Sequence, residues 1–225
     1  WFNWPTTADP TRDPEAALRD VQHAIDTHGA DQILALVIEP VYQTTGRAVP
    51  TTFWQPLRDL ADTHGLPIVA IESASAAWRT GQGMWRSDSL PVSIDSVWWY
   101  VGGQLGLVFL SDALYVPAKL TLISTWDGDG IGFHKLLWEL RALRQLPIAS
   151  RGRRLGEILK TLGEVEGEGL YRTVHTAEPQ RLIDGLRKRG FAVGKTDEGA
   201  LRFCPGLDIT DVELDTLERA IEHLQ

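Results

Sequence analysis

Residues 33–38, Ile-Leu-Ala-Leu-Val-Ile, form a continuous apolar run that closes at Glu39-Pro40. A run of this length without polar alternation predicts a strand that is buried on both faces. Residues 51–64 then have the spacing of an amphipathic helix, and residues 67–71, Pro-Ile-Val-Ala-Ile, form a second buried strand. The order strand, helix, strand is typical of a βαβ unit, so we predict a mainly parallel sheet with helices packed on it.

The alternation of helical and strand patterns continues on both sides of this unit. Before it, residues 14–28 have the apolar spacing of an amphipathic helix. After it, residues 96–101 and 105–110 are two further apolar runs, separated by Gly102-Gly103. We therefore expect an α/β fold over the first two thirds of the chain.

Glycines and small polar residues mark the expected ends of the first helices. Gly29 and Gly65 each follow a helical segment, and glycine readily adopts the left-handed conformation that ends many helices. Thr51 or Thr52 is the expected N-cap of the second helix, because a side-chain oxygen there can accept from a free backbone N–H.

The last third of the chain has a different pattern, in which helices alternate with short strands. Thr210 or Asp208 would cap its final helix. The patterns indicate a small α+β unit, so we place the domain boundary near Pro147, with residues 1–146 as part of a large domain and 147–225 as the small domain. The expected helices span 131–146, 151–162, 179–189 and 211–224, and the expected strands span 170–174, 191–194 and 200–203.

The composition restricts the partners that we expect. A formal net charge of −8 argues against a nucleic-acid or anionic-membrane surface, and Arg151–Arg154 and Arg187–Arg189 are interpreted as solvated helix faces. The single cysteine, Cys204, excludes an internal disulfide and fits a reducing, cytoplasmic compartment. No apolar run has the length of a membrane span, no signal peptide is evident, and the six histidines lack metal-ligand spacing.

Four stretches, taken in order, carry a resemblance to a known family. They are Trp1–Pro5, Leu36–Val41 with its strand end Glu39-Pro40, Leu122–Trp126 with its Ser-Thr-Trp sequence, and Leu201–Leu207 with Arg202-Phe203. Together they resemble class III aminotransferases, which depend on pyridoxal phosphate (PLP), and most closely the lysine ε-aminotransferase branch. The resemblance covers nearly the whole chain. It implies the C-terminal half of a PLP-transferase-like (fold type I) chain: a partial large domain followed by a small α+β domain.

The resemblance also locates the lysine that forms the Schiff base with PLP in this family. The matching position is Val101, six residues after Asp95, and no lysine occurs between Trp1 and Ala118. PLP chemistry requires such an amine. Lys119 is the one local candidate that could replace it, and an ordinary loop lysine is the alternative interpretation.

A second family position holds the aspartate that keeps the pyridinium nitrogen protonated. It falls on Ile71, and a shift to Glu72 would turn the carboxylate to the opposite face of the strand. Ser75 matches the glutamine that follows. Trp98, Trp99 and Tyr100 bring large rings to the place where the cofactor would lie, either as core or interface filling or as a platform for a ligand. We therefore expect no covalently bound PLP on this chain.

Other family positions are retained. Ser124 and Thr125 match the residues that contact the phosphate of the PLP bound in the partner subunit. Arg202 matches the arginine that binds a substrate carboxylate, with a surface ion pair as the alternative. Glu39 matches a strand-end glutamate, whereas Thr44 replaces the acidic residue that the lysine branch has at its gate.

Three hypotheses follow from the sequence. The first is a degenerate, non-catalytic subunit. It would pair with a complete PLP-bearing homologue, or with its own missing half, in a homo- or hetero-oligomer. It would complete, stabilise or regulate that partner. The second is an active class III aminotransferase that transfers an amino group from a diamine or amino acid to a 2-oxo acid, with a lysine such as Lys119 or one from another chain. The third is a binding module around Arg202. An incomplete sheet exposes an edge, so we expect the chain not to stand alone in solution.

Overall fold

The computed structural model describes residues 7–102, 105–118 and 129–224. The chain divides into two compact units. The first unit lies within Trp1–Pro40, Val49–Ser73 and Ser89–Phe133, and the second within Val41–Ala48, Ala74–Asp88 and His134–Gln225. Each unit is described by itself, and the predicted division into domains at residue 147 stays a prediction.

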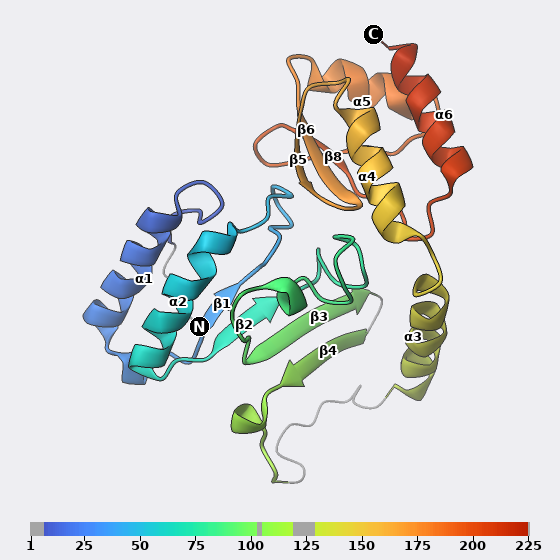
Figure 1. Cartoon of the computed structure of the whole chain (residues 1–225). Coiled ribbons are helices and arrows are strands. Elements are labelled where there is room, and N and C mark those ends of the chain that lie inside the picture. The colour runs from blue at the N-terminus through green and yellow to red at the C-terminus, as the bar shows by residue number, and fades with distance from the viewer. Residues whose placement is uncertain (1–6, 103–104, 119–128, 225) are drawn as a thin grey trace. The chain divides into compact units, whose positions relative to one another are not determined.

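The first unit contains a four-stranded sheet in the order β1-β2-β3-β4 (Figure 1). Its strands are β1 (Leu36–Ile38), β2 (Ile68–Ile71), β3 (Ser96–Gly102) and β4 (Leu105–Leu110). β1, β2 and β3 are parallel, which confirms the predicted mainly parallel sheet. β4 runs antiparallel to β3, because the connection after Gly102 is too short for the crossover that a parallel neighbour requires.

Two helices accompany this sheet and contact each other, α1 (Pro14–His28) and α2 (Thr51–His64) (Figure 1). Both end at the predicted glycines, and Gly65 has the left-handed φ of 66° that favours this residue. The prediction of a threonine N-cap for α2 was wrong. The helix begins at Thr51 itself, after Pro50, and no side chain caps it.

The prediction for residues 33–38 was correct in type but too long. Only Leu36–Ile38 form the strand, and Leu34 lies outside it with its side chain 80% exposed. Ile38 is buried, whereas Leu36 and Val37 are partly buried. The apolar run therefore predicted the strand but not its first residues.

The second unit is an α+β arrangement around an antiparallel sheet in the order β5-β6-β8-β7. The strands are β5 (Glu164–Glu168), β6 (Tyr171–His175), β7 (Gly194–Lys195) and β8 (Leu201–Phe203). Its helices are α4 (Ile148–Leu159), α5 (Pro179–Lys188) and α6 (Asp211–Glu222), while α3 (Gly130–Leu143) crosses from the residues of the first unit to those of the second. Helices α4, α5 and α6 pack on the sheet through a core that includes Leu155, Leu186, Leu201 and Leu214.

The last helix confirms the predicted capping residue. Thr210 accepts a hydrogen bond from the backbone N–H of Glu213, and the Glu213 carboxylate accepts one from the backbone N–H of Thr210. This reciprocal pair is a capping box, which satisfies two backbone donors that a helix otherwise leaves open. Three 3-10 turns complete the described elements, at Ala30–Gln32, Ser87–Ser89 and Asp112–Leu114.

Two loops that precede α3 in sequence pack against the β5–β6 hairpin of the second unit. The backbone N–H of Leu170 donates to the carbonyl of Arg79 over 2.8 Å, and the Tyr171 hydroxyl donates to the carbonyl of Gln43. Gly46 lies against the ring of Tyr171, so there is no room for a side chain at this position. The loops 41–48 and 74–88 are therefore part of the second unit.

Candidate functional site

Ile71 ends β2, at the carboxyl edge where parallel α/β sheets usually hold ligands, and it lies opposite Trp98 of β3. The parallel register places these two residues opposite each other, so their side chains extend from the same face of the sheet. Ile71 is partly buried, and the Trp98 indole N–H donates to Ser96 Oγ over 2.9 Å. Where the resemblance expects an aspartate, this edge presents an isoleucine beside an indole.

Val101 lies further along β3, at an irregularity in its pairing with β4. The register shifts between Tyr100 and Gly102, so Val101 occupies the irregular position. Its side chain is partly buried. Where the resemblance expects the lysine amine, the strand therefore carries an aliphatic side chain.

The residues that follow Ile71 fix the chain to β3. The backbone N–H of Glu72 donates to the carbonyl of Trp98 over 2.8 Å, and the backbone N–H of Tyr100 donates to Ser73 Oγ over 3.2 Å. Glu72 and Ser75 are both fully buried. Strand alternation turns Glu72 away from the face of Ile71, so its carboxylate does not replace the missing aspartate on that face.

The fit of PLP to this edge can be judged from the side chains present. A Schiff base needs an amine and a protonated pyridinium needs a nearby carboxylate, and Val101 and Ile71 supply neither. Trp98 lies on the face of Ile71, where the ring would need space. These residues do not fit PLP held as an aldimine at this edge.

Arg202 lies in β8, in the second unit, where Thr173 and Gly194 are its neighbours on the adjacent strands. Its guanidinium lies over Gly194, since a Cβ there would be 3.1 Å from Arg202 Nε. Within the described residues no carboxylate forms an ion pair with Arg202, so the surface ion pair that we considered for it is not found there. The side chain is partly buried.

The remaining predicted site residues differ in their surroundings. Glu39 follows β1 directly and is partly buried, whereas Thr44 is exposed in the second unit. Ser124, Thr125 and Lys119 lie outside the described residues, so their predicted roles rest on the resemblance alone.

Sequence reasoning missed the ion pairs that Glu166 and Glu168 of β5 form. Arg47 Nε donates to Glu166 over 3.0 Å and Arg86 Nε donates to Glu168 over 2.8 Å. Glu198 also pairs with Arg47. Both arginine side chains are only 7% exposed. Glu166 and Glu168, two positions apart in a short polar segment, were the available signal for basic partners elsewhere in the chain.

Arg172 of β6 is a partly buried arginine within this hairpin. Its guanidinium donates to the carbonyls of Gly167 and Gly169. Desolvation lowers the pKa of Arg172 from its usual value, and the nearby carboxylates of Glu168 and Glu157 oppose that shift. The arginine closes the hairpin turn through backbone carbonyls.

Within the described part of the chain, no group of three His, Cys, Asp or Glu side chains could hold a metal ion. Over the same residues, no helix is both long and apolar enough to cross a membrane.

Comparison with curated proteins finds aminotransferases. An ornithine aminotransferase of Staphylococcus carnosus is 28% identical over 208 residues, which covers 82% of this chain and 51% of that protein. A Caenorhabditis elegans protein named "Probable 4-aminobutyrate aminotransferase, mitochondrial" is 23% identical over 260 residues, covering 99% and 54%. No family model matches the chain. The chain thus spans about half the length of the curated relatives that it matches.

Solved structures give the same result for the fold. The lysine aminotransferase of Mycobacterium tuberculosis in its internal aldimine form superposes with a TM-score of 0.84 at 24% identity, over 99% of this chain and 58% of that one. An (S)-enantioselective omega-transaminase from Thermomicrobium roseum gives 0.77 at 21% identity, over 94% and 55%. This chain is therefore similar to class III PLP-dependent aminotransferases and has their fold over a part of their length.

Proposed function

We propose that this chain is a non-catalytic, aminotransferase-like subunit that associates with a complete, PLP-bearing aminotransferase-like chain. The proposal assigns the chemistry to the partner. This chain would stabilise that partner, complete its active site or regulate it.

The observation that carries the proposal is the pair Val101 and Ile71 at the edge of the parallel sheet. An aliphatic group beside a buried pyridinium leaves a charge without its partner, which costs several kcal/mol, on the order of the loss of a buried ion pair. Since no lysine occurs between Trp1 and Ala118, the first unit has no described amine for an aldimine.

An exposed apolar face supports association with another chain. Trp98 of β3 lies opposite Val108 of β4, and the same face carries Tyr100 and Leu110. These four side chains are between 40% and 60% exposed. Within the described residues β4 is also the outer strand of its sheet. Contiguous apolar side chains beside an open strand edge are typical of surfaces that another chain covers.

The residues that match retained family positions suggest how the subunit would contribute. Ser124 and Thr125 would donate to the phosphate of PLP bound in the partner subunit, as the resemblance implies. Arg202 would bind a substrate carboxylate, and its guanidinium has no described carboxylate partner to compete with such an anion.

Reduction of the purified protein with borohydride tests the assignment, because it fixes any PLP–lysine aldimine as a stable amine. Peptide mapping of this chain then examines all of its lysines, including Lys119. We expect no phosphopyridoxyl group on any of them. A stoichiometric adduct on Lys119, together with loss of aminotransferase activity in Lys119→Ala, would establish the chain as an active aminotransferase and contradict the proposal.

A further inference from the structure

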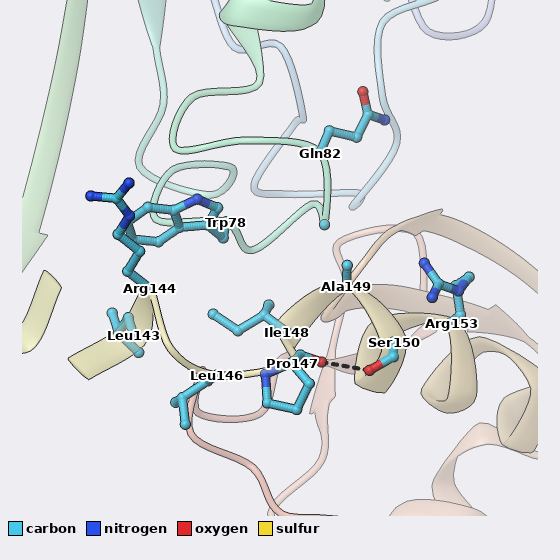
Figure 2. Close-up of a pocket in the computed structure, with 11 residues that line it drawn as sticks. Trp78, Gln82, Leu143, Arg144, Leu146, Pro147, Ile148, Ala149, Ser150 and Arg153 are labelled. Carbon is cyan, nitrogen blue, oxygen red and sulfur yellow. Dashed lines mark hydrogen bonds between the residues drawn. The ribbon is translucent and has the colours of Figure 1, made fainter. Parts of the chain in front are cut away.

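The two units differ in what their surfaces offer to a ligand or a partner. In the second unit, a pocket of about 320 Å³ lies at the start of α4 (Figure 2). The guanidinium groups of Arg144 and Arg153 lie at opposite ends of this pocket, as Figure 2 shows, so the pocket specifies no single small ligand. The first unit has a more specific surface, the outer edge of β4, which is the last strand of its described sheet (Figure 1).

Outer strands usually carry features that prevent pairing with another chain, such as charged side chains or a very short length. Three of the four outer strands of the described sheets have such a feature. β1 has three residues, β7 has two, and β5, Glu-Val-Glu-Gly-Glu, carries three carboxylates. β4, Leu-Gly-Leu-Val-Phe-Leu, has six residues with neither a charge nor a proline. β4 therefore lacks the usual protection against pairing.

The hydrogen bonds between β3 and β4 show which way the peptide groups of β4 point. The backbone N–H of Ser111, directly after β4, donates to the carbonyl of Asp95 over 2.8 Å, toward β3. In an antiparallel pair, every second residue exchanges hydrogen bonds with its neighbour, and the residues between them point the other way. In the regular register that precedes Ser111, the peptide groups of Leu110, Val108 and Gly106 therefore point away from β3.

The other side of β3 gives the same direction. The carbonyl of Trp98 accepts from the backbone N–H of Glu72 over 2.8 Å, on the side of β2. Trp98 lies opposite Val108, so these two residues do not exchange hydrogen bonds with each other. The N–H of Val108 is therefore a donor at the outer edge, where the described part of the chain contains no further strand.

The side chains of β4 restrict what can lie beside it. Val108 and Leu110 are exposed on one face of the strand, and Phe109 is exposed on the other. Side chains of neighbouring strands lie side by side on each face. A segment that pairs with β4 therefore needs apolar side chains on both faces and no charge, which is typical of a strand from the interior of a folded sheet.

We propose that the complete, PLP-bearing partner chain adds a strand of its own to the outer edge of β4, so that the sheet of the first unit continues into the partner. This inference rests on the association proposed above and specifies how it is made. The partner's segment is extended, uncharged, apolar on both faces and about as long as β4. Main-chain hydrogen bonds to Gly106, Val108 and Leu110 supply affinity, and the side chains supply specificity.

Residue-resolved hydrogen exchange of the purified assembly tests the inference. The N–H groups of Leu107 and Phe109 point toward β3 and serve as an internal control. If a partner strand pairs with β4, the outward N–H groups of Val108 and Leu110 should exchange as slowly as the inward ones, at least about a hundredfold more slowly than unstructured amides. Outward groups that exchange at least about tenfold faster than the inward ones would overturn the inference, because the partner would then cover only a face of the strand.

Two substitutions of one residue separate pairing through the backbone from packing of the side chain. Val108→Pro removes an outward donor, and proline is tolerated at an open sheet edge but not between two paired strands. It should weaken association at least about a hundredfold, measured by native mass spectrometry of the assembly on dilution. Val108→Ala keeps the N–H and shortens the side chain, so it should weaken association about tenfold or less. Equal weakening by the two substitutions would contradict pairing through the backbone.

The fold of the proline variant is checked in the same way. Slow exchange at Leu107 and Phe109 in Val108→Pro means that β4 still pairs with β3. If the variant does not fold, the exchange rates of the unaltered assembly decide the question without it.

The outcomes also separate this inference from the proposed function. An assembly without a second, longer chain contradicts the proposed function and the inference together. A longer chain that is present while Val108 and Leu110 exchange rapidly overturns the inference alone. Slow exchange at these two residues in an assembly made only of copies of this chain would mean that a second copy supplies the strand, which also contradicts the inference.

Discussion

At the scale of single residues, the second unit is organised around arginines that the sequence places far from their partners. Arg47 and Arg86 come from the two loops that precede α3, and their carboxylate partners Glu166 and Glu168 both lie on β5. Because the arginine side chains are nearly inaccessible, each pair stabilises the fold mainly by avoiding a buried charge without a counter-charge. The pairs hold the loops on the hairpin.

Glu168→Gln tests the contribution of one of these pairs. The substitution keeps the size of the side chain but removes the charge that Arg86 binds through both Nε and Nη2. We expect a loss of about 2–4 kcal/mol in the free energy of unfolding, measured by urea denaturation. Glu157→Gln is the matched control, because Glu157 is 71% exposed in its pair with Lys160, and it should cost less than about 0.5 kcal/mol.

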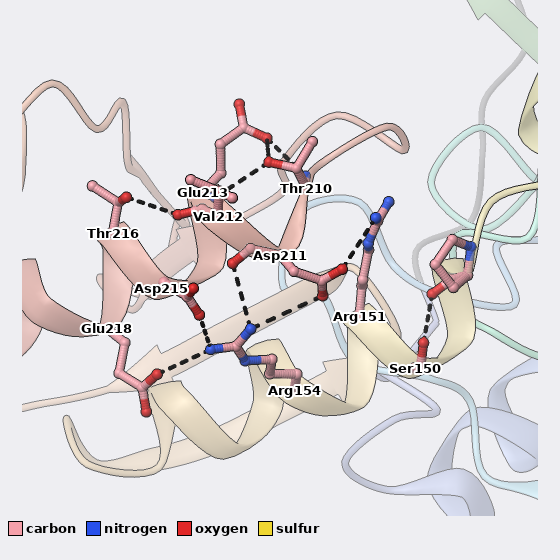
Figure 3. Close-up of polar contacts among 11 residues, drawn as sticks. Ser150, Arg151, Arg154, Thr210, Asp211, Val212, Glu213, Asp215, Thr216 and Glu218 are labelled. Atoms are coloured by element: carbon pink, nitrogen blue, oxygen red, sulfur yellow. Dashed lines mark hydrogen bonds and ion pairs between the residues drawn. The ribbon is translucent and has the colours of Figure 1, made fainter.

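Thr210→Ala tests the capping box of α6, which Figure 3 shows. Loss of the side-chain acceptor should destabilise the protein by about 1 kcal/mol near pH 7. Hydrogen bonds from the backbone and side chain of Thr210 lower the pKa of Glu213, so this contribution is present above the usual carboxylate pKa and is lost as the pH falls through the lowered value.

The deficit of Thr210→Ala should therefore shrink between neutral pH and a pH below the lowered pKa of Glu213, where this carboxylate is protonated. Urea midpoints at the two pH values measure it. Thr216→Ala, which removes a hydroxyl from the exposed face of the same helix, should show no such change. An equal deficit for Thr210→Ala at both pH values would contradict the assigned role of Glu213.

At the scale of elements, the sequence predicted the helices whose apolar spacing is strong. It missed the strand β5, whose composition is polar. α1, α2 and α6 agree with the predicted segments to within a few residues, and Gly29, Gly65 and Thr210 mark their ends. β5, Glu-Val-Glu-Gly-Glu, has little apolar character and exists because it pairs with β6. Pairing of this kind is a tertiary effect, which local patterns do not carry.

The turn of the β5–β6 hairpin gives a prediction at this scale. Gly169 has a φ of +54°, and a Cβ there would lie 2.0 Å from the carbonyl oxygen of Arg79. Gly169→Ala should therefore cost at least about 3 kcal/mol or prevent folding, as measured by thermal unfolding. Gly190 has a φ of +89° with open space around it, so Gly190→Ala should cost only about 1 kcal/mol. Equal costs would mean that the packing of the turn on the loop is unimportant.

The apolar face of β3 and β4 gives a second prediction at the scale of elements. Val108→Glu places a charge among Trp98, Tyr100 and Leu110, and we expect it to weaken association with a partner chain at least about tenfold. Val212→Glu is the matched control, because Val212 is similarly exposed on α6, and it should leave association unchanged. Size-exclusion chromatography with light scattering measures both. Unchanged assembly in Val108→Glu would exclude this face as the interface.

At the scale of the whole molecule, the chain has the fold of a class III aminotransferase over about half of the length of its relatives. The resemblance located Ile71, Val101 and Arg202 from sequence, and the structure shows their surroundings. Sequence could not show that Trp98 shares the face of Ile71 or that Arg202 has no described carboxylate partner, because both depend on strand register and on contacts between distant residues.

Native mass spectrometry of the borohydride-treated assembly tests the central claim most directly, since it reports the chains present and the cofactor that each one carries. We predict this 25.0 kDa chain without a PLP adduct, in an assembly with a second, longer chain that carries one. An assembly that contains only this chain, with PLP fixed to it, would contradict the account and would make the chain itself the aminotransferase.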